Sequence, residues 1–227
     1  MPTIPRKPRT PMATRPRRQI TQYLLSAALL AGAAPAAQAN DLIRHWAGIT
    51  APPAPIVHKV TLDPKTTALL LLDFVTQTCS NTRRPQCVAT IPAIRTLLAT
   101  ARAHHATIIY SYVLSGTKAD INPALTPRPG EASVQSGPDK FLHTNLAQRL
   151  RQDGIKTVII TGTAAEGAVL ATASEATYRG YTVILPYNGM SSTHPYAEQY
   201  VAWDLLNAPA TSQHTILTSL GLIRFGS

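Results

Sequence analysis

The stretch that decides the fold is residues 156–174, KTVIITGTAAEGAVLATAS. Its apolar beginning, KTVII, is typical of a strand buried on both faces of a sheet, and the small residues from Glu166 onward predict a helix that ends at Gly180. A tight turn joins the two, an arrangement with which many α/β enzymes present a reactive group. Yet the tip of this turn is Ala168, whose side chain has no nucleophilic atom.

The rest of the chain repeats this alternation of strand and helix. Further buried strands are predicted at 66–74 (TTALLLLDF), 106–113, 181–188 and 214–219, helices at 88–105, 141–154 and 195–208, and a Gly/Pro/Ser-rich surface excursion at 114–138. The alternation favours right-handed βαβ units, and therefore one α/β domain with a parallel sheet covered on both faces. Ligands of such sheets bind beyond the carboxyl ends of the strands, where Asp73, the turn at 161–168 and Asn188 fall.

The formal net charge of +10 arises mainly at the N-terminus. Residues 1–39 hold six of the 21 lysines and arginines and no acidic residue, which leaves 15 basic and 11 acidic residues for the rest of the chain. This mildly basic remainder has no Lys/Arg cluster with interleaved aromatic residues, so nucleic acid is not expected as a partner.

The N-terminus has the order of an export signal. A basic region ends at Arg17-Arg18, an apolar region runs from about Ile20 to Ala34, and AQA at 37–39 offers small residues for cleavage. The apolar run is too short for a stable membrane span, and the arginine pair leaves the Sec and twin-arginine routes open. We therefore expect a signal peptide at 1–39, an extended Pro-rich arm at 40–64, a folded domain at 65–227, and a periplasmic or secreted protein.

The two cysteines, Cys79 and Cys87, lie eight positions apart in a polar loop that contains a proline. A pair this close in an oxidising compartment is typical of a local disulfide, so we expect one here. Two cysteines without a second pair nearby are a weak signal for zinc.

Three blocks of sequence resemble the isochorismatase-like (cysteine hydrolase) superfamily. ALLLLDF is similar to the first strand with its catalytic aspartate, KFLHTNLAQRLRQDGIKTVIITG to the F-x-x-T-x-L stretch and the next strand, and GAVLATASEATYRGYTVILP to the nucleophile helix and the strand after it. The resemblance covers most of the chain from about Thr66 to Leu217. It implies a three-layer α/β/α fold with a six-stranded parallel sheet of the Rossmann-like kind. It also implies homo-oligomers and hydrolysis of small amides or, in the isochorismatases proper, of a vinyl ether.

The machinery of that family is an Asp–Lys–Cys triad, and this sequence matches it only in part. Asp73 fits the aspartate, which takes the proton from the thiol. The cysteine position, six residues after Gly162, holds Ala168. Because alanine offers no nucleophile, the covalent amidase chemistry of the family is excluded at this position.

The lysine of the triad is also displaced. Its position, six residues before Phe141, holds Gln135, whereas Lys140 lies immediately before Phe141. Two interpretations remain open: Lys140 has taken over the role of the family lysine, or it is a solvated surface residue.

Three functional hypotheses follow. In the first, Asp73 is a general acid/base that protonates a vinyl ether, as in isochorismatases, which also lack the cysteine; Glu166 is then either a second acid or a glutamate favoured by the helix dipole. In the second, Cys79 or Cys87 is a relocated nucleophile. In the third, the chain is a catalytically inactive relative that binds a small ligand or acts as an oligomeric scaffold.

The resemblance also implies a set of substrate-binding residues: Gln135, Phe141, Thr163, Ala164, Glu166 and Gly167. It further implies a cis peptide bond between Thr163 and Ala164 and backbone N–H groups near the helix start that hold a carboxylate or an oxyanion. No cluster of acidic and histidine ligands follows Asp73, and the adjacent His104 and His105 point in different directions on a helix, so we expect no metal. No nucleotide-binding motif occurs either, so no cofactor is expected.

Overall fold

The computed structural model describes residues 41–226, so the expected signal peptide lies outside the described residues. The chain divides into two compact units that meet in sequence between Ala51 and Pro52. The described part of the first unit is exposed and contains a 3-10 turn, η1 (Trp46–Gly48). All the other described helices and strands belong to the second unit, and no helix within 41–226 is long and apolar enough to cross a membrane.

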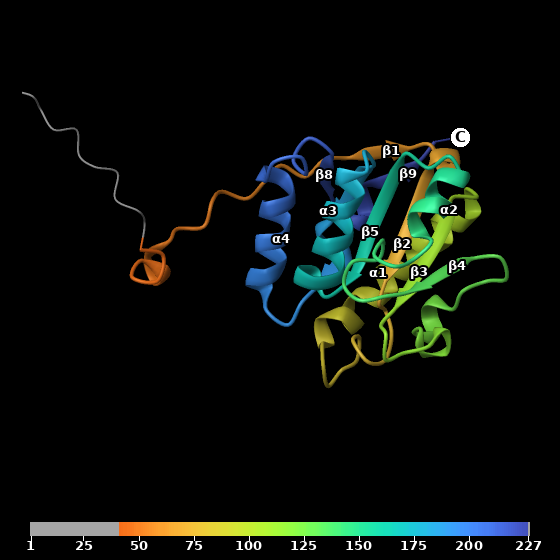
Figure 1. Ribbon diagram of the computed structural model, residues 1–227, viewed down its shortest axis with the longest axis horizontal. Coiled ribbons are helices and arrows are strands. Elements are labelled where there is room, and N and C mark those ends of the chain that lie inside the picture. Colours follow the sequence, from red (N-terminus) through yellow and green to blue (C-terminus); the bar gives the residue numbers. More distant parts are fainter. Residues whose placement is uncertain (1–40, 227) are drawn as a thin grey trace, which may run out of the picture. The chain divides into compact units, whose positions relative to one another are not determined.

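The second unit is built around a sheet of seven parallel strands (Figure 1). Its main path runs in the order β4 (Ala132–Gln135), β3 (Thr107–Tyr112), β2 (Thr67–Leu72), β5 (Thr157–Thr163), β6 (Thr182–Pro186) and β8 (Thr215–Thr218). The two-residue strand β7 (Met190–Ser191) pairs with the end of β5. The predicted parallel α/β sheet is thereby confirmed, with seven strands in place of six.

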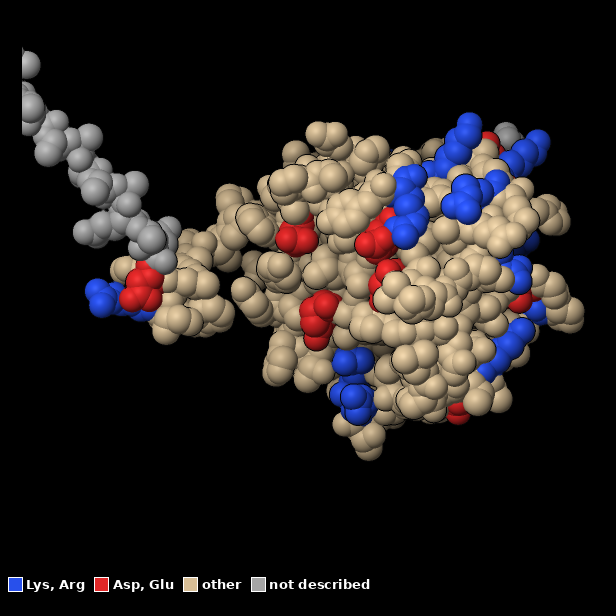
Figure 2. Space-filling model, in the orientation of Figure 1, with Lys and Arg blue, Asp and Glu red and all other residues tan. Residues whose placement is uncertain are grey.

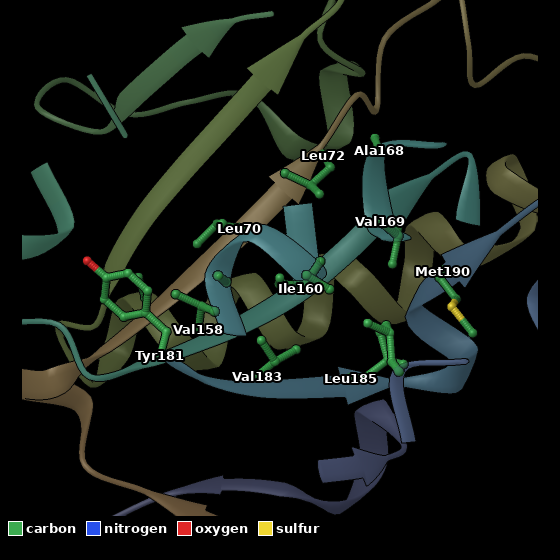
Figure 3. Packing of buried hydrophobic residues seen from close by; sticks show 14 of the residues in the cluster. Leu70, Leu72, Val158, Ile160, Ala168, Val169, Tyr181, Val183, Leu185 and Met190 are labelled. Atoms are coloured by element: carbon green, nitrogen blue, oxygen red, sulfur yellow. The ribbon is translucent and has the colours of Figure 1, made fainter. Parts of the chain in front are cut away.

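Helices cover both faces of this sheet. Helices α2 (Leu146–Gln152), α3 (Leu170–Tyr178) and α4 (Pro195–Asn207) lie on the face turned to the viewer in Figure 1, and α1 (Pro85–Ala103) lies on the other. Alternate residues of β2 serve the two cores, because Leu70 and Leu72 pack with α2, α3 and α4 while Leu69 and Leu71 pack with α1. Figure 3 shows the first of these cores around Leu70 and Leu72. A strand buried on both faces needs such an uninterrupted leucine run.

Some elements were not visible in the sequence pattern. The predicted surface excursion contains η3 (Lys118–Asp120), η4 (Pro123–Leu125) and strand β4, in which only Val134 is fully buried. The last residues before the predicted domain form β1 (Val60–Leu62), which pairs in parallel with β9 (Ile223–Phe225). The helix predicted from Glu166 begins as a π-helical turn, η5 (Ala165–Val169), and three more short turns are η2 (Pro64–Thr66), η6 (Tyr187–Gly189) and η7 (Leu220–Leu222).

The order of strands reverses between β2 and β5. The chain runs outward from β2 through β3 to β4 and then returns to the other side of β2 with β5. At the end of this pair, Gly162 lies opposite Leu72 with φ of 140°, and a Cβ atom on it would lie 2.2 Å from the Leu72 carbonyl oxygen. Only glycine therefore lets the two strands approach this closely, and Asp73 and Thr163 are the residues directly after this pair.

Candidate active site

A cleft of about 420 Å³ opens at the carboxyl ends of β2 and β5, where the reversal of strand order predicts a ligand site. Asp73, Thr163 and Ala168 lie in its wall. The other lining residues are Thr78, Arg83, Arg84, Val113, Leu114, Ser115, Ser136, Gly137, Pro138, Ala164 and Gly167. A larger hollow of about 690 Å³ between residues 52–57 and α4 contains none of the predicted site residues.

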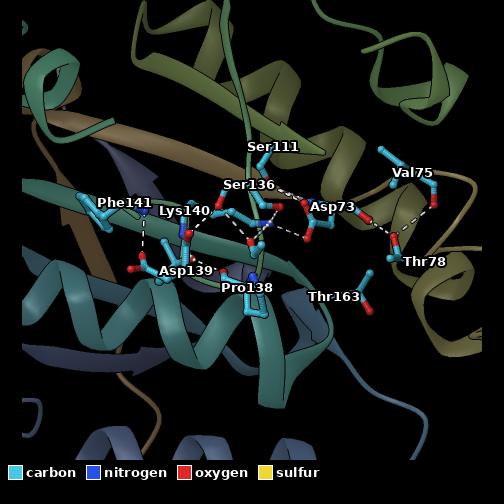
Figure 4. A network of polar contacts seen from close by, with 12 residues as sticks. Asp73, Val75, Thr78, Ser111, Ser136, Pro138, Asp139, Lys140, Phe141 and Thr163 are labelled. Carbon is cyan, nitrogen blue, oxygen red and sulfur yellow. Dashed lines mark hydrogen bonds and ion pairs between the residues drawn. The ribbon is translucent and has the colours of Figure 1, made fainter. Parts of the chain in front are cut away.

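Asp73 and Lys140 form a buried ion pair in the wall of this cleft (Figure 4). The Lys140 Nζ lies 2.7 Å from Asp73 Oδ2, and the Lys140 side chain is fully buried. The same ammonium group donates to the carbonyl oxygens of Gly137 at 2.7 Å and Ser136 at 3.4 Å. Lys140 is therefore a buried partner of the predicted acid and not a solvated surface residue.

The ammonium group of Lys140 is buried and directly contacts a carboxylate. Burial lowers the pKa of Lys140 from its ordinary value, and the carboxylate of Asp73 opposes that shift. An ammonium group with a lowered pKa gives up its proton more readily than a surface lysine does. The 2.7 Å contact between Nζ and Oδ2 is a direct route for that proton.

Ser111, on β3, fixes the other side of Asp73. Its hydroxyl donates to Asp73 Oδ1 at 2.6 Å and accepts from the Asp73 backbone N–H at 3.1 Å. Thr78 adds a third contact, because its hydroxyl donates to the Asp73 carbonyl oxygen at 2.5 Å. Asp73 itself has φ of 55°, a conformation that aspartate and asparagine adopt more readily than most residues. Ser111 was not predicted from the sequence, because it is only one of several hydroxyl-bearing residues in the run ATIIYSYV.

The turn after β5 brings backbone and small side chains to the cleft. The peptide bond between Thr163 and Ala164 is cis, which confirms that expectation. The N–H groups of Gly167 and Val169 donate to the Ala164 carbonyl oxygen at 3.1 and 3.2 Å, so these two donors are already used within the turn. Ala168, at the position where the resemblance implies a nucleophile, is buried and is one of the residues that line the cleft.

The two cysteines of the sequence are joined in a disulfide between Cys79 and Cys87, as predicted. No thiol is therefore free in the described chain, which contradicts the hypothesis of a relocated cysteine nucleophile. The bridge closes the loop that leads from β2 into α1, and this loop forms one side of the cleft.

Arg84, within the disulfide loop, is a cleft residue that sequence analysis did not single out. Its Nη1 donates to the Thr78 carbonyl oxygen at 2.9 Å and to Thr163 Oγ1 at 3.0 Å. Burial lowers the pKa of the Arg84 guanidinium from its ordinary value, and the Glu166 carboxylate opposes that shift. The signal in the sequence was the basic pair Arg83-Arg84 between the two cysteines.

The structure brings only part of the predicted substrate-binding set to the cleft. Those that line it are Thr163, Ala164 and Gly167. Gln135 instead donates to the carbonyl oxygens of Leu114 and Gly116 and so holds a loop at the cleft rim. Phe141 is buried in the hydrophobic core, and Glu166 is exposed and lies outside the lining.

The described residues offer no evident metal site. Within 41–226, no three His, Cys, Asp or Glu side chains lie close enough together to hold an ion. His104 and His105 are exposed at the end of α1, and the ring of His104 stacks on Phe225. The charged groups at the cleft are a carboxylate with its ammonium partner and two arginines, which suit proton transfer and the binding of an anion.

Comparison with known proteins agrees with this architecture. Residues 67–215 match the family described as Isochorismatase domain. A curated relative, the secreted isochorismatase effector Isc1 of Verticillium dahliae, is 35% identical over 108 residues, which cover 43% of this chain and 57% of the relative. The chain thus spans little more than half the length of that relative.

Two solved structures share the fold. An isochorismatase-like hydrolase from Alkaliphilus metalliredigens superimposes with a TM-score of 0.62 at 24% identity, over 69% of this chain and 95% of that one. A cysteine hydrolase from Pseudomonas syringae pv. phaseolicola superimposes with a TM-score of 0.63 at 20% identity, over 74% and 94% of the two chains. These likenesses concern the fold, and the family match over residues 67–215 establishes that the chain belongs to the isochorismatase family.

Proposed function

We propose that this member of the isochorismatase family hydrolyses a small vinyl ether without a protein nucleophile, with Asp73 as general acid/base. The observation that carries the proposal is the buried contact of 2.7 Å between Lys140 Nζ and Asp73 Oδ2 in a cleft that Ala168 also lines. The relative from Verticillium dahliae is named an isochorismatase, which supports the same class of substrate.

The reaction is R–O–C(=CH₂)–R′ + H₂O → R–OH + CH₃–CO–R′. Lys140 passes a proton to the Asp73 carboxylate, and the resulting acid protonates the terminal CH₂ carbon of the substrate. Water adds to the oxygen-stabilised cation and releases a proton that restores the ammonium group of Lys140. The hemiketal then loses the alcohol R–OH and leaves the ketone.

Ala168 suits this chemistry in two ways. It removes the thiol that would attack a carbonyl carbon in the amidase members of the family. Its methyl group also occupies less of the cleft than a cysteine side chain would, which leaves room beside Asp73 for substrate and water. No residue from the described chain is required to form a covalent bond with the substrate.

The test is turnover by the purified mature protein on a panel of vinyl ethers, isochorismate included, and of small amides. The variants are Asp73→Asn, which keeps the backbone conformation at φ of 55°, and Ala168→Cys. Asp153→Asn is the matched control, because Asp153 is exposed at the end of α2 and lies outside the cleft.

We expect vinyl-ether hydrolysis in the wild type and in Asp153→Asn, its loss in Asp73→Asn, and no effect of thiol alkylation. Wild-type silence on every substrate, with amidase activity appearing only in Ala168→Cys, would show a retained pocket without an enzyme. That result would favour the alternative of an inactive relative that binds a small ligand or acts as a scaffold.

We further propose that the protein is exported, with residues 1–39 as the signal peptide, residues 40–64 as the arm and 65–227 as the catalytic domain. The disulfide and the word "secreted" in the name of the fungal relative support export. N-terminal sequencing of protein from the periplasm or medium of the native host checks this, and a chain retained unprocessed in the cytoplasm would contradict it.

Homo-oligomerisation also remains a proposal. The outer face of α4 supports it, because Tyr196, Tyr200 and Trp203 are 67%, 41% and 45% exposed, and aromatic residues are enriched at protein interfaces. Light scattering of the mature protein checks the mass, and a monomer across the accessible concentration range would contradict the proposal.

A further inference from the structure

The charges that line the cleft do not balance. Asp73, Arg83 and Arg84 are the ionisable acids and bases in the lining, so the wall carries one excess positive charge even with Asp73 ionised. The ammonium of Lys140, directly behind Asp73, raises the excess to two. Figure 2 shows basic side chains at the lower edge of the domain, over the segment that leads from β2 into α1 in Figure 1.

The guanidinium of Arg84 has donors that the protein leaves unused. Its Nη1 is bound to the Thr78 carbonyl and to Thr163, but its Nε is buried without a hydrogen-bond partner. Within residues 41–226 no carboxylate lies within 4 Å of this guanidinium or of that of Arg83, and the nearby Glu166 is exposed and outside the lining. A partly buried cation without a paired anion is costly, and a ligand carboxylate would offset that cost.

The disulfide explains how Arg84 is kept at this position. The Cys79–Cys87 bridge closes the loop around Arg84, and the hydrogen bonds of Nη1 join that loop to its own start and to the end of β5. The guanidinium is thus held in the wall of the cleft that Asp73 also lines before a ligand arrives, which reduces the entropy lost on binding.

From this placement we propose that Arg84, assisted by Arg83, is a specificity-determining anion subsite, and that the substrate is a small carboxylate. The cleft volume of about 420 Å³ suits a molecule with one ring and a carboxylate. The carboxylate binds the arginine side of the cleft, which places the rest of the molecule between Arg84 and Asp73. This inference rests on the proposed function only in taking the bound carboxylate to be a substrate, because the subsite itself is defined by ligand binding without turnover.

The test is calorimetric titration of the mature protein, the chain without the proposed signal peptide, with benzoate and with benzamide, its uncharged near-isostere. The variants are Arg84→Gln, Arg84→Lys and Arg83→Gln. Arg95→Gln is the matched control, since Arg95 is an exposed arginine of α1, the helix that begins directly after Arg84, and lies outside the cleft. Binding is measured without turnover, so the result does not depend on whether the protein is an enzyme.

We expect the wild type and Arg95→Gln to bind benzoate more tightly than benzamide. Arg84→Gln should weaken benzoate by about 10- to 100-fold, the value of a charge-assisted hydrogen bond, and leave benzamide nearly unchanged. Arg84→Lys should recover part of the loss, because the charge remains but the planar fork does not.

Equal affinity of the wild type and Arg84→Gln for benzoate would overturn the proposal, as would a wild type that binds neither compound or that does not discriminate between them. Benzoate binding that depends on Arg84 in a protein that turns over no vinyl ether would refute the proposed hydrolase and leave the subsite standing. Turnover of uncharged vinyl ethers as fast as that of charged ones would refute the anion subsite and leave the proposed hydrolase standing.

Discussion

The two sides of the cleft differ in how their charges are compensated. On one side, Asp73 and Lys140 are buried, 2.7 Å apart, and bonded to Ser111 and Gly137. On the other, Arg84 is held by neutral oxygens on a loop closed by a disulfide. A compensated pair can pass a proton between its members, whereas an uncompensated cation is free to bind the charge of a ligand. We therefore propose that the first side carries out the chemistry and that the second recognises the ligand.

Breaking the buried pair should have the largest effect. Asp73→Asn and Lys140→Met should each reduce kcat by about 10²- to 10⁴-fold, because each removes a member of the proton-transfer pair. Each should also lower the free energy of unfolding by about 3–5 kcal/mol, since the remaining partner is buried without compensation.

Urea unfolding of the double variant Asp73→Asn/Lys140→Met sharpens that prediction. Replacing both charges removes the uncompensated group, so the double variant should be more stable than Lys140→Met. Additive losses in the double variant would mean that the two side chains do not stabilise each other.

Removing the disulfide on the Arg84 side of the cleft should have an intermediate effect on stability and on ligand affinity. In Cys79→Ser/Cys87→Ser the nine-residue loop is no longer closed, and the free energy of unfolding should fall by about 2–3 kcal/mol. Benzoate affinity should fall toward that of Arg84→Gln, because Arg84 is no longer held in place. Unchanged benzoate affinity in this variant would show that the bridge does not position the arginine.

A smaller effect is expected from Ser111→Ala. The substitution removes the hydroxyl that bonds to both the carboxylate and the backbone N–H of Asp73, and the free energy of unfolding should fall by about 1–3 kcal/mol. The value of kcat should fall while benzoate affinity stays unchanged, since the arginine side is untouched. A loss of benzoate affinity would show that the two sides are not independent.

The smallest effect is the pH dependence of stability. Because burial lowers the pKa of Lys140 in the folded protein, the unfolded chain binds more protons between that lowered value and the ordinary lysine value of 10.5. Over this alkaline window Lys140 therefore contributes a stability that rises with pH, and kcat should fall as the ammonium is lost. The slope of stability against pH should be smaller in Lys140→Met, and an identical slope would contradict the assignment.

Much of the fold was predictable because its strands are buried on both faces. The apolar composition of TALLLL in β2 and of the run before Gly162 predicts both strands. The turn after the second run locates the cleft. Strand β4 was not predicted, because its residues are mostly half-buried and lie in a Gly/Pro-rich segment. Strand β1 was also not predicted, because it is short and pairs only with β9, near the other end of the described chain.

The site was predictable only where a single residue carries the signal. Asp73 follows a strongly predicted strand. The environment of Lys140, however, depends on a long-range contact between the segment 136–140 and Asp73, which no local pattern reveals. Ser111 and Arg84 are ordinary residues by sequence, and they become site residues because tertiary packing brings them to Asp73 and Thr163.

The most direct test of the central claim is hydrolysis of isochorismate in H₂¹⁸O, with the isotope content of the released alcohol measured by mass spectrometry. Protonation of the vinyl carbon by Asp73 and addition of water to that cation predict an alcohol that keeps the ether oxygen and contains no ¹⁸O. An alcohol labelled with ¹⁸O, or no wild-type turnover at all, would contradict the account.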